Sequence, residues 1–141
     1  MKVHVDELTP NRRRGGDVRL SLTPKTVGAT CGLGGVVFLQ EGEFVCEHYH
    51  PYSEEFVHVV AGNVTMRVGD EEVPMGPGDA LVVPIGVRHR VSHGGGEPVH
   101  IVFHLSPLAP RPELGHVDTE DLPDAELHPL PDVGGPVEGS R

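Results

Sequence analysis

The sequence predicts an all-β fold, in which short strands form a single sandwich or barrel. Apolar and polar residues alternate in one short segment after another, which is typical of half-buried strands. Turn-forming residues separate these segments, and the chain contains 19 glycines and 14 prolines. No segment of useful length has the spacing of an amphipathic helix, which a helical bundle or a parallel α/β fold would need. Evenly spaced short strands instead favour a sandwich or a barrel.

Each expected strand is bounded by turn residues. VRLSL comes first, EGE separates GVVFLQ from FVCEHYH, and HPYS precedes EFVHVV. AGN leads into VTMRV, and the following Gly69–Asp70 pair predicts a tight hairpin to EEVPM. GPGD, PIG and GGGEP then precede DALVVP, RHRVS and VHIVFHL. The expected strands therefore cover residues 18–22, 35–40, 44–50, 55–60, 64–68, 71–75, 79–84, 88–92 and 99–105.

The two ends of the chain differ from this middle part. Residues 1–16 are polar and have no period, so they predict an N-terminal arm before a barrel over residues 17–105. Residues 106–141 are rich in proline and acidic residues, and we expect them to form no core. The sequence predicts that this tail is partly disordered, or that it lies in extended form over the barrel or over a second subunit.

Length, charge and cysteine content limit the possible classes of protein. With 141 residues, the chain is long enough for one domain with a core. The net charge of −10 opposes nucleic acid and anionic membranes as partners. No apolar stretch is long enough to span a bilayer, and the first residues lack the apolar core of a secretory signal. We therefore expect a cytoplasmic protein in which Cys31 and Cys46 are free thiols.

Two histidines lie one residue apart at the end of an expected strand. Side chains alternate along a strand, so residues 44, 46, 48 and 50 of FVCEHYH share one face. Phe44 and Cys46 are apolar, which predicts that this face points into the barrel and that His48 and His50 lie at its mouth. Buried imidazoles without partners are unfavourable, whereas two of them about 7 Å apart on one strand face can bind one ion.

Two further ligand candidates follow from the same chemistry. Glu55 opens the next strand on the same face as Val57 and Val59, and His89 follows the turn PIG. Three histidines and a carboxylate leave coordination positions open for water or substrate, which is typical of a catalytic metal site. The sequence therefore predicts a metal site formed by His48, His50, Glu55 and His89.

The segments that contain these residues resemble the two signatures of the cupin superfamily. GEFVCEHYHPYSEEFVHVVAG is similar to the first signature and GDALVVPIGVRH to the second. The resemblance implies a single cupin, a jelly-roll β-barrel or β-sandwich that holds one divalent metal ion near its mouth, and it assigns the same four ligands. The second signature often continues to an asparagine four residues after its histidine. This chain has His93 there, which alters the local hydrogen bonding.

Most of the chain also resembles the small single-cupin cyclases of actinomycete aromatic-polyketide pathways. The similarity lies in TVGATCGLGGVVFL, EHYHPYSEEF, VPIGVRHRV and VFHLSPLAPRPELGHVDTE. It implies a metal-dependent cyclase that promotes regioselective aldol cyclisation and aromatisation of a poly-β-ketone, a substrate that an acyl carrier protein could carry. The implied cofactor is one divalent ion per subunit, with zinc favoured and iron, nickel and manganese as alternatives.

His104 is the candidate catalytic base. It shares one face of the strand 99–105 with His100 and Val102, whereas Ile101 and Phe103 lie on the other face. If the histidine face lines the barrel, His104 reaches the metal site as a base or as a fourth nitrogen ligand. The alternative is a solvated histidine on an outer strand. We expect the remaining candidates to lie outside the site: His4, His58, His116 and His128, together with Arg88 and Arg90.

Two other functions stay open at the level of sequence. An iron- or nickel-dependent dioxygenase of an aromatic or diketone substrate would use the same ligands. A non-catalytic small-molecule-binding cupin is the third possibility, although such proteins usually lose ligands and this chain has all four. Glycine- and proline-rich ends invite exchange between subunits, and sheet edges need cover, so the sequence also predicts a homodimer.

Overall fold

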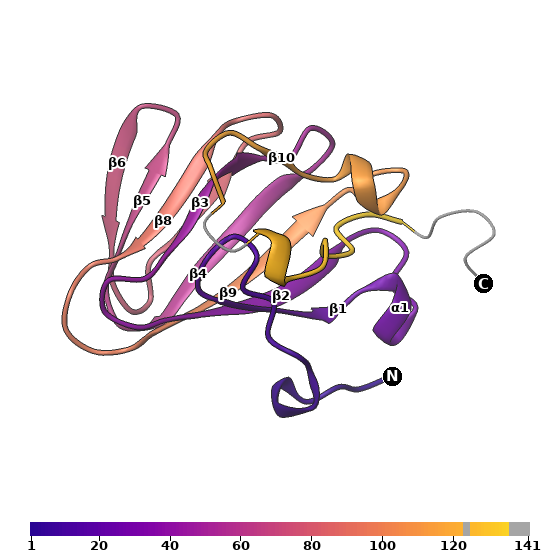
Figure 1. Cartoon of the computed structure of the whole chain (residues 1–141), viewed down its shortest axis with the longest axis horizontal. Coiled ribbons are helices and arrows are strands. Elements are labelled where there is room, and N and C mark those ends of the chain that lie inside the picture. The colour runs from indigo at the N-terminus through magenta and orange to yellow at the C-terminus, as the bar shows by residue number, and fades with distance from the viewer. Residues whose placement is uncertain (123–124, 136–141) are drawn as a thin grey trace.

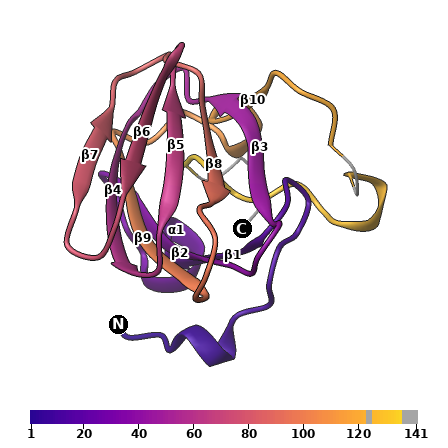
Figure 2. The ribbon, with the colours of Figure 1, turned by 90° about the vertical axis from the view of Figure 1, so that its left-hand side faces the viewer.

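Two antiparallel sheets of five strands each face one another, as Figures 1 and 2 show. The computed structural model describes residues 1–122 and 125–135, so the remaining residues of the predicted tail lie outside the described part. The first sheet has the spatial order β1 (Asp17–Leu22), β2 (Leu33–Leu39), β9 (Val99–Ser106), β4 (Glu54–Ala61) and β7 (Ala80–Val83). The second has the order β10 (Val117–Asp118), β3 (Phe44–Tyr49), β8 (His89–His93), β5 (Val64–Val68) and β6 (Glu71–Met75).

Alternation of side chains fills the space between the two sheets. Along β4, Val57 and Val59 are buried, whereas Phe56 and Val60 on the opposite face are exposed. Burial of the alternate apolar residues from both sheets stabilises the sandwich by about 25 cal/mol for each Å² removed from water. The predicted all-β fold is confirmed, and each of the nine expected strands is present within one or two residues.

The hairpin between β5 and β6 has the turn that the sequence predicts. Gly69 has φ 59°, a left-handed conformation that glycine adopts without a steric penalty. Across the turn, Val68 pairs with Glu71 and Val64 with Met75. The turn therefore sets a register in which Met66 and Met75 are buried in the core.

Helices are short in this chain. Residues 1–122 and 125–135 contain one α-helix, α1 (Pro24–Val27), which begins after Thr23, whose side chain accepts a hydrogen bond from the Thr26 amide. The same residues contain three 3-10 helices: η1 (Val5–Glu7), η2 (Pro112–Leu114) and η3 (Ala125–Leu127). Among the described residues, no helix is long and apolar enough to cross a bilayer.

The N-terminal arm is attached to both sheets. Asn11 forms an isolated antiparallel bridge with Val18 of β1, and the carbonyl of Arg14 accepts a hydrogen bond from the amide of Cys46 in β3 at 2.8 Å. The Arg14 side chain is only 7 % exposed. The arm therefore places the buried guanidinium of Arg14 at one end of the barrel.

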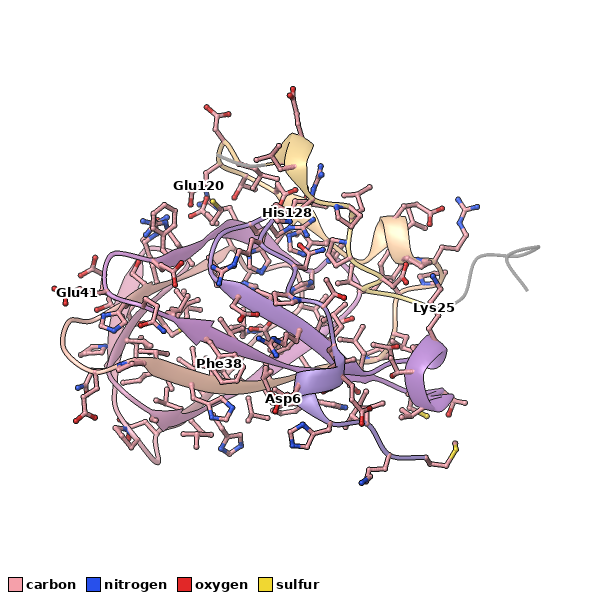
Figure 3. All side chains as sticks on the ribbon, turned by 60° about the horizontal axis from the view of Figure 1, so that its bottom comes forward. Asp6, Lys25, Phe38, Glu41, Glu120 and His128 are labelled. Carbon is pink, nitrogen blue, oxygen red and sulfur yellow. The ribbon has the colours of Figure 1, made fainter. Side chains whose placement is uncertain are left out.

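The described part of the C-terminal tail lies over the barrel and contributes to the core, contrary to the prediction that it forms none. Its residues Val117 and Asp118 form β10, which extends the second sheet beside β3. Ala109 and Val133 are buried, and Val133 belongs to the main apolar cluster. In Figure 3, the labelled Glu120 and His128 mark the tail above the strands. Scattered apolar residues in a proline-rich segment thus cover the barrel without any periodic pattern.

Candidate metal centre

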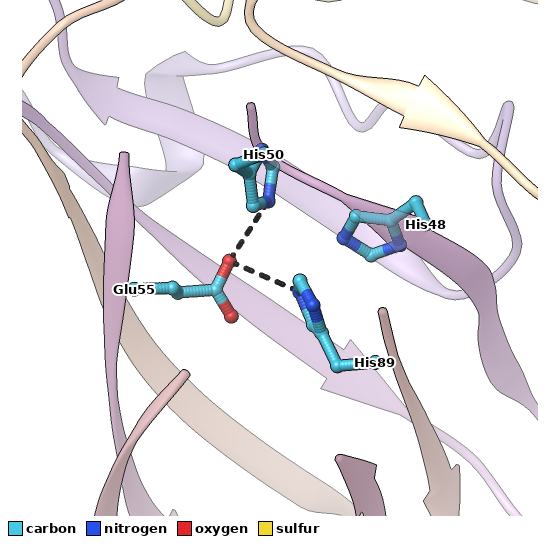
Figure 4. A group of neighbouring side chains, drawn as sticks. All are labelled: His48, His50, Glu55 and His89. Carbon is cyan, nitrogen blue, oxygen red and sulfur yellow. Dashed lines mark ion pairs between the residues drawn. The ribbon is translucent and has the colours of Figure 1, made fainter. Parts of the chain in front are cut away.

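Four side chains from three strands and one loop meet at one end of the barrel (Figure 4). His48 lies near the end of β3, and it pairs directly across the sheet with His89, the first residue of β8. His50 follows β3, and Glu55 reaches the same point from β4 in the facing sheet. One ligand atom from each residue lies within 4.8 Å of the others. The sandwich thus brings the four predicted ligands together.

Backbone carbonyls determine which ring nitrogen of each histidine faces the cluster. The Nδ1 atoms of His48, His50 and His89 lie 2.6, 2.8 and 3.1 Å from the carbonyl oxygens of Cys46, Gly115 and Val87, respectively. A carbonyl oxygen can only accept, so each Nδ1 carries the proton and each Nε2 has a free lone pair. This arrangement orients metal-binding histidines in many proteins.

Two of these Nε2 atoms are buried and have no hydrogen-bond partner among the described residues, namely those of His50 and His89. They lie 3.2 and 3.6 Å from Oε1 of Glu55 but do not form hydrogen bonds of good geometry with it. Buried polar atoms without partners are unfavourable, and an ion among them removes this cost. Ligands of one zinc ion lie at most about 4.2 Å apart, so only a small contraction is needed. The cluster fits a divalent metal ion.

The charge balance of the cluster also favours a cation. Burial lowers the pKa of His48 well below its usual value, and the neighbouring His89 and His116 rings lower it further. Burial raises the pKa of Glu55, but His89 and His50 outweigh this effect, and the pKa lies well below its ordinary value. Burial lowers the pKa of His89, but the Glu55 carboxylate and the Val87 carbonyl together outweigh this effect. The pKa of His89 therefore lies above its ordinary value. The Glu55 carboxylate therefore requires positive charge beside it, which a divalent ion would supply.

A β-bulge in β3 corrects the predicted faces of this strand. The register shifts between Val45 and His48, so Val45 lines the cavity together with the two histidines. Phe44 and Cys46 therefore lie on the opposite face, where Cys46 is covered by the tail and lies 3.7 Å from the carbonyl oxygen of Asp121. The predicted shared face was wrong for these two residues because one extra residue reverses the alternation. Cys46 is nevertheless buried, and both cysteines are free thiols.

His104 does not lie at the cluster, so the assignment of this residue as catalytic base is corrected. On β9 the buried face consists of Ile101, Phe103 and Leu105, which line the cavity. His104 lies on the outer face and is exposed, with its ring 6.3 Å from that of Phe56. The apolar face of the strand turned inward because its burial is more favourable than that of imidazoles without partners.

His116 is the site residue that the sequence prediction missed. Its side chain is only 7 % exposed, and its ring stacks on that of His48 at a centroid distance of 4.3 Å. Its Nε2 lies 2.9 Å from Oδ1 of Asp118, while Nδ1 makes no hydrogen bond to the described residues. Burial lowers the pKa of His116 to about 4. The sequence signal for this position is weak, because β10 has just two residues. The alternation in HVD, which places His116 and Asp118 on one face, was the only indication.

An apolar cavity of about 80 Å³ adjoins the cluster. Its walls come from both sheets and include Val37, Met66 and Phe103. The arm and the tail complete its lining with three polar or charged residues, Asn11, Arg14 and His116, and with two apolar ones, Pro131 and Val133. The metal cluster therefore opens into a mostly apolar space that the two chain ends cover.

The other residues singled out in the sequence lie away from the cavity. His58 is exposed on the outer face of β4. Arg88 and Arg90 point to carboxylates on the outside, Glu47 at 3.7 Å and Glu120 at 2.9 Å. His93 stabilises the following turn, since its Nδ1 accepts from the Gly95 amide and its Nε2 lies 2.7 Å from the Glu97 carbonyl.

Comparison with known proteins agrees with this architecture. The family model for the cupin domain matches residues 35–105, which span β2 to β9 and contain all four cluster residues. The chain belongs to the cupin family. This cupin is 54 % identical over 131 residues to the polyketide synthase CurC of Streptomyces cyaneus, which covers 91 % of the chain and 85 % of the relative. It is 47 % identical over 134 residues to the tetracenomycin polyketide synthase protein TcmJ of Streptomyces glaucescens, with 95 % and 89 % covered.

A solved structure supports the fold of this cupin. The oxalate decarboxylase of Lactobacillus farciminis in complex with formate matches with a TM-score of 0.70 and 24 % identity. The match covers 82 % of this chain and 34 % of the decarboxylase. At this identity the similarity concerns the jelly-roll fold alone.

Proposed function

We propose that this cupin is a metal-dependent cyclase of aromatic polyketide biosynthesis, which promotes regioselective aldol cyclisation and aromatisation of a poly-β-ketone. The observation that carries the proposal is the cluster of three histidines and Glu55 at the end of an apolar cavity. Two relatives named as polyketide synthase proteins, at 54 % and 47 % identity over most of the chain, support the pathway.

In this proposal His48, His50, Glu55 and His89 hold one divalent ion, with zinc favoured because the reaction is redox-neutral. When bound, such an ion polarises a ketone oxygen as a Lewis acid. The carbonyls that hold the three Nδ1 protons keep the imidazoles oriented toward the ion.

The residues of the chain itself bind the substrate, transfer a proton and exclude water. The apolar walls bind the carbon skeleton in one folded arrangement, which brings the reacting carbons together. His116 takes the part first assigned to His104: Asp118 accepts its Nε2 proton, so Nδ1 has a lone pair available to accept a proton in the cavity. The arm and tail residues over the cavity exclude water, and a cavity of about 80 Å³ requires them to move aside for a larger substrate.

The partners in this proposal are a polyketide delivered by an acyl carrier protein and a second copy of the chain, in the cytoplasm. A homodimer is expected because the outer face of the first sheet exposes apolar side chains, among them Phe56 and Val82, which pair across β4 and β7. Sedimentation at micromolar protein concentration measures the mass directly. A monomer there contradicts the dimer and leaves the cyclase proposal intact.

Dependence on oxygen distinguishes the cyclase from a dioxygenase on the same ligands. The zinc-loaded chain is incubated with a poly-β-ketone generated by its synthase, with and without oxygen, and ring products are separated by chromatography. Aldol closure and loss of water are redox-neutral, so we expect equal product under both conditions and full activity with redox-inert zinc. Product that requires oxygen and is lost with zinc would identify a dioxygenase instead. Absence of any conversion with every metal would favour a binding cupin.

A further inference from the structure

Arg14 is the one arginine of the basic segment Arg12–Arg14 that is among the residues lining the cavity. It is 7 % exposed, and burial lowers its pKa while the hydrogen bond and charge of Asp118 oppose that effect. Arg12 instead pairs with Glu43 at 3.1 Å on the outside, and Arg13 donates to the tail carbonyls of Ala125 and His128. Three neighbouring arginines thus have three separate environments.

The partner of Arg14 leaves part of its guanidinium free. Nε donates to Oδ1 of Asp118 at 2.7 Å, and Nη2 to Oδ2 at 3.4 Å. A guanidinium has five N–H donors, so three have no hydrogen-bond acceptor among the described residues. No Arg14 nitrogen is among the fully buried side-chain atoms that lack a partner in the described part of the chain, so a small molecule can reach the unused donors. Because Arg14 is one of the residues that line the cavity, a ligand there can supply the acceptor.

A continuous set of contacts connects Arg14 with the metal cluster. Oδ1 of Asp118 accepts from Nε of Arg14 at 2.7 Å and from Nε2 of His116 at 2.9 Å, and the His116 ring stacks on His48. Most of the other residues that line the cavity are apolar. Two polar anchors therefore lie along one apolar cavity, with His116 between them. A ligand that satisfies both has an apolar carbon skeleton with oxygen atoms at more than one position.

We propose that Arg14 is a specificity-determining residue that binds an oxyanion of the substrate, the enolate or the carboxylate of a poly-β-ketone, while another of its oxygens lies at the metal cluster. The proposal rests on the cyclase function for the identity of the substrate, but not for the chemistry of recognition. A planar guanidinium suits this task because its parallel N–H groups match a delocalised oxyanion. Asp118 orients it without using all its donors.

A purely structural role for Arg14, as a link between arm and tail, predicts a different result. Arg13 forms the same kind of link, since its Nη1 lies 2.6 Å from the Ala125 carbonyl and 2.9 Å from that of His128, but it does not line the cavity. Arg13→Gln therefore loosens arm and tail without removing the cavity cation, and it is the matched control for Arg14→Gln.

The experiment measures binding of two pairs of probes to the full-length chain loaded with zinc, by calorimetry or ligand-observed NMR. The first pair is phenylacetate and phenylacetamide, which differ in charge but hardly in shape. The second is 1-phenylbutane-1,3-dione, which enolises readily, and 1-phenylbutan-1-one. Any contribution of the metal is common to all variants, so it cancels when they are compared. The pair that shows an Arg14-dependent preference identifies the oxyanion as carboxylate or enolate.

We expect the wild-type chain to prefer phenylacetate in the first pair, or the enolisable dione in the second, about 10-fold, the worth of one charge-assisted hydrogen bond. Arg14→Gln should reduce this ratio to about one, and Arg13→Gln should leave it unchanged. Arg14→Lys keeps the charge but loses the planar fork, so the ratio should fall only in part; it provides the test if the glutamine variant does not fold. An unchanged ratio in both Arg14 variants, or equal loss in Arg13→Gln, would overturn the proposal. Because this experiment measures binding and not turnover, its result does not depend on whether the chain catalyses cyclisation.

Discussion

Replacement of His48, His50 or His89 with alanine is expected to abolish binding of a divalent ion while the fold remains. Each substitution removes one of four donor atoms that lie within 4.8 Å of one another. Loss of a residue that merely orients a metal ligand lowers affinity 10- to 100-fold, so loss of a ligand should lower it by more than about 100-fold. The fold should persist because the three rings lie at or near strand ends, outside the main apolar cluster.

Elemental analysis after dialysis against zinc measures the metal, and circular dichroism measures the fold. His104→Ala is the matched control, since this histidine is exposed on the outer face of β9 and should keep full metal content. Glu55→Gln should weaken binding less, because an amide oxygen remains at the same place. One zinc ion per chain in any of the three site variants would contradict the ligand assignment.

The strands could be predicted because their periodicity reflects burial on one side. Val57 and Val59 alternate with exposed neighbours along β4, and the sheet requires this alternation. Contact between His48 and His89 could likewise be expected, since both are polar groups at strand ends and could share one ion. The local pattern and the chemistry of the donor set led to the same four residues.

The bulge in β3 and the inner face of β9 could not be predicted in this way. A bulge adds one residue to one strand, and neither Cys46 nor Glu47 is of a type that indicates it. On β9 both faces contain apolar residues, so periodicity alone allowed His104 to point inward. Which face of β9 points inward depends on the facing sheet, where Met66 and Val91 present apolar side chains that cannot bind an imidazole.

The contribution of the two chain ends was the largest difference between prediction and structure. Their contacts are specific but not periodic: Arg14 reaches Asp118 across 104 residues, and Asn11 donates to the Pro129 carbonyl. Such contacts depend on the tertiary arrangement of loops, for which a sequence offers only composition. His116 was missed for this reason, although it stacks directly on a predicted ligand.

Gly115→Ala is expected to have the second largest effect, because Gly115 connects the tail with the metal cluster. Its carbonyl lies 2.8 Å from Nδ1 of His50, and a Cβ atom at Gly115 would collide with the carbonyl of Val133 where the tail crosses itself. The backbone of Gly115, with φ −83° and ψ −1°, suits alanine, so the collision alone causes the effect. We expect a loss of about 1–3 kcal/mol in the free energy of unfolding.

Zinc affinity should fall with stability in this variant. If the tail shifts, the His50 ring loses the carbonyl that holds its Nδ1 proton, and loss of such a contact lowers metal affinity 10- to 100-fold. Gly34→Ala is the control, since its Cβ would lie 3.5 Å from the nearest atom, the Phe103 carbonyl oxygen, which is ordinary contact. Thermal unfolding and zinc titration measure both effects. If Gly115→Ala matched the control in both, the tail would not position His50, and the ligand cluster would depend on the two sheets alone.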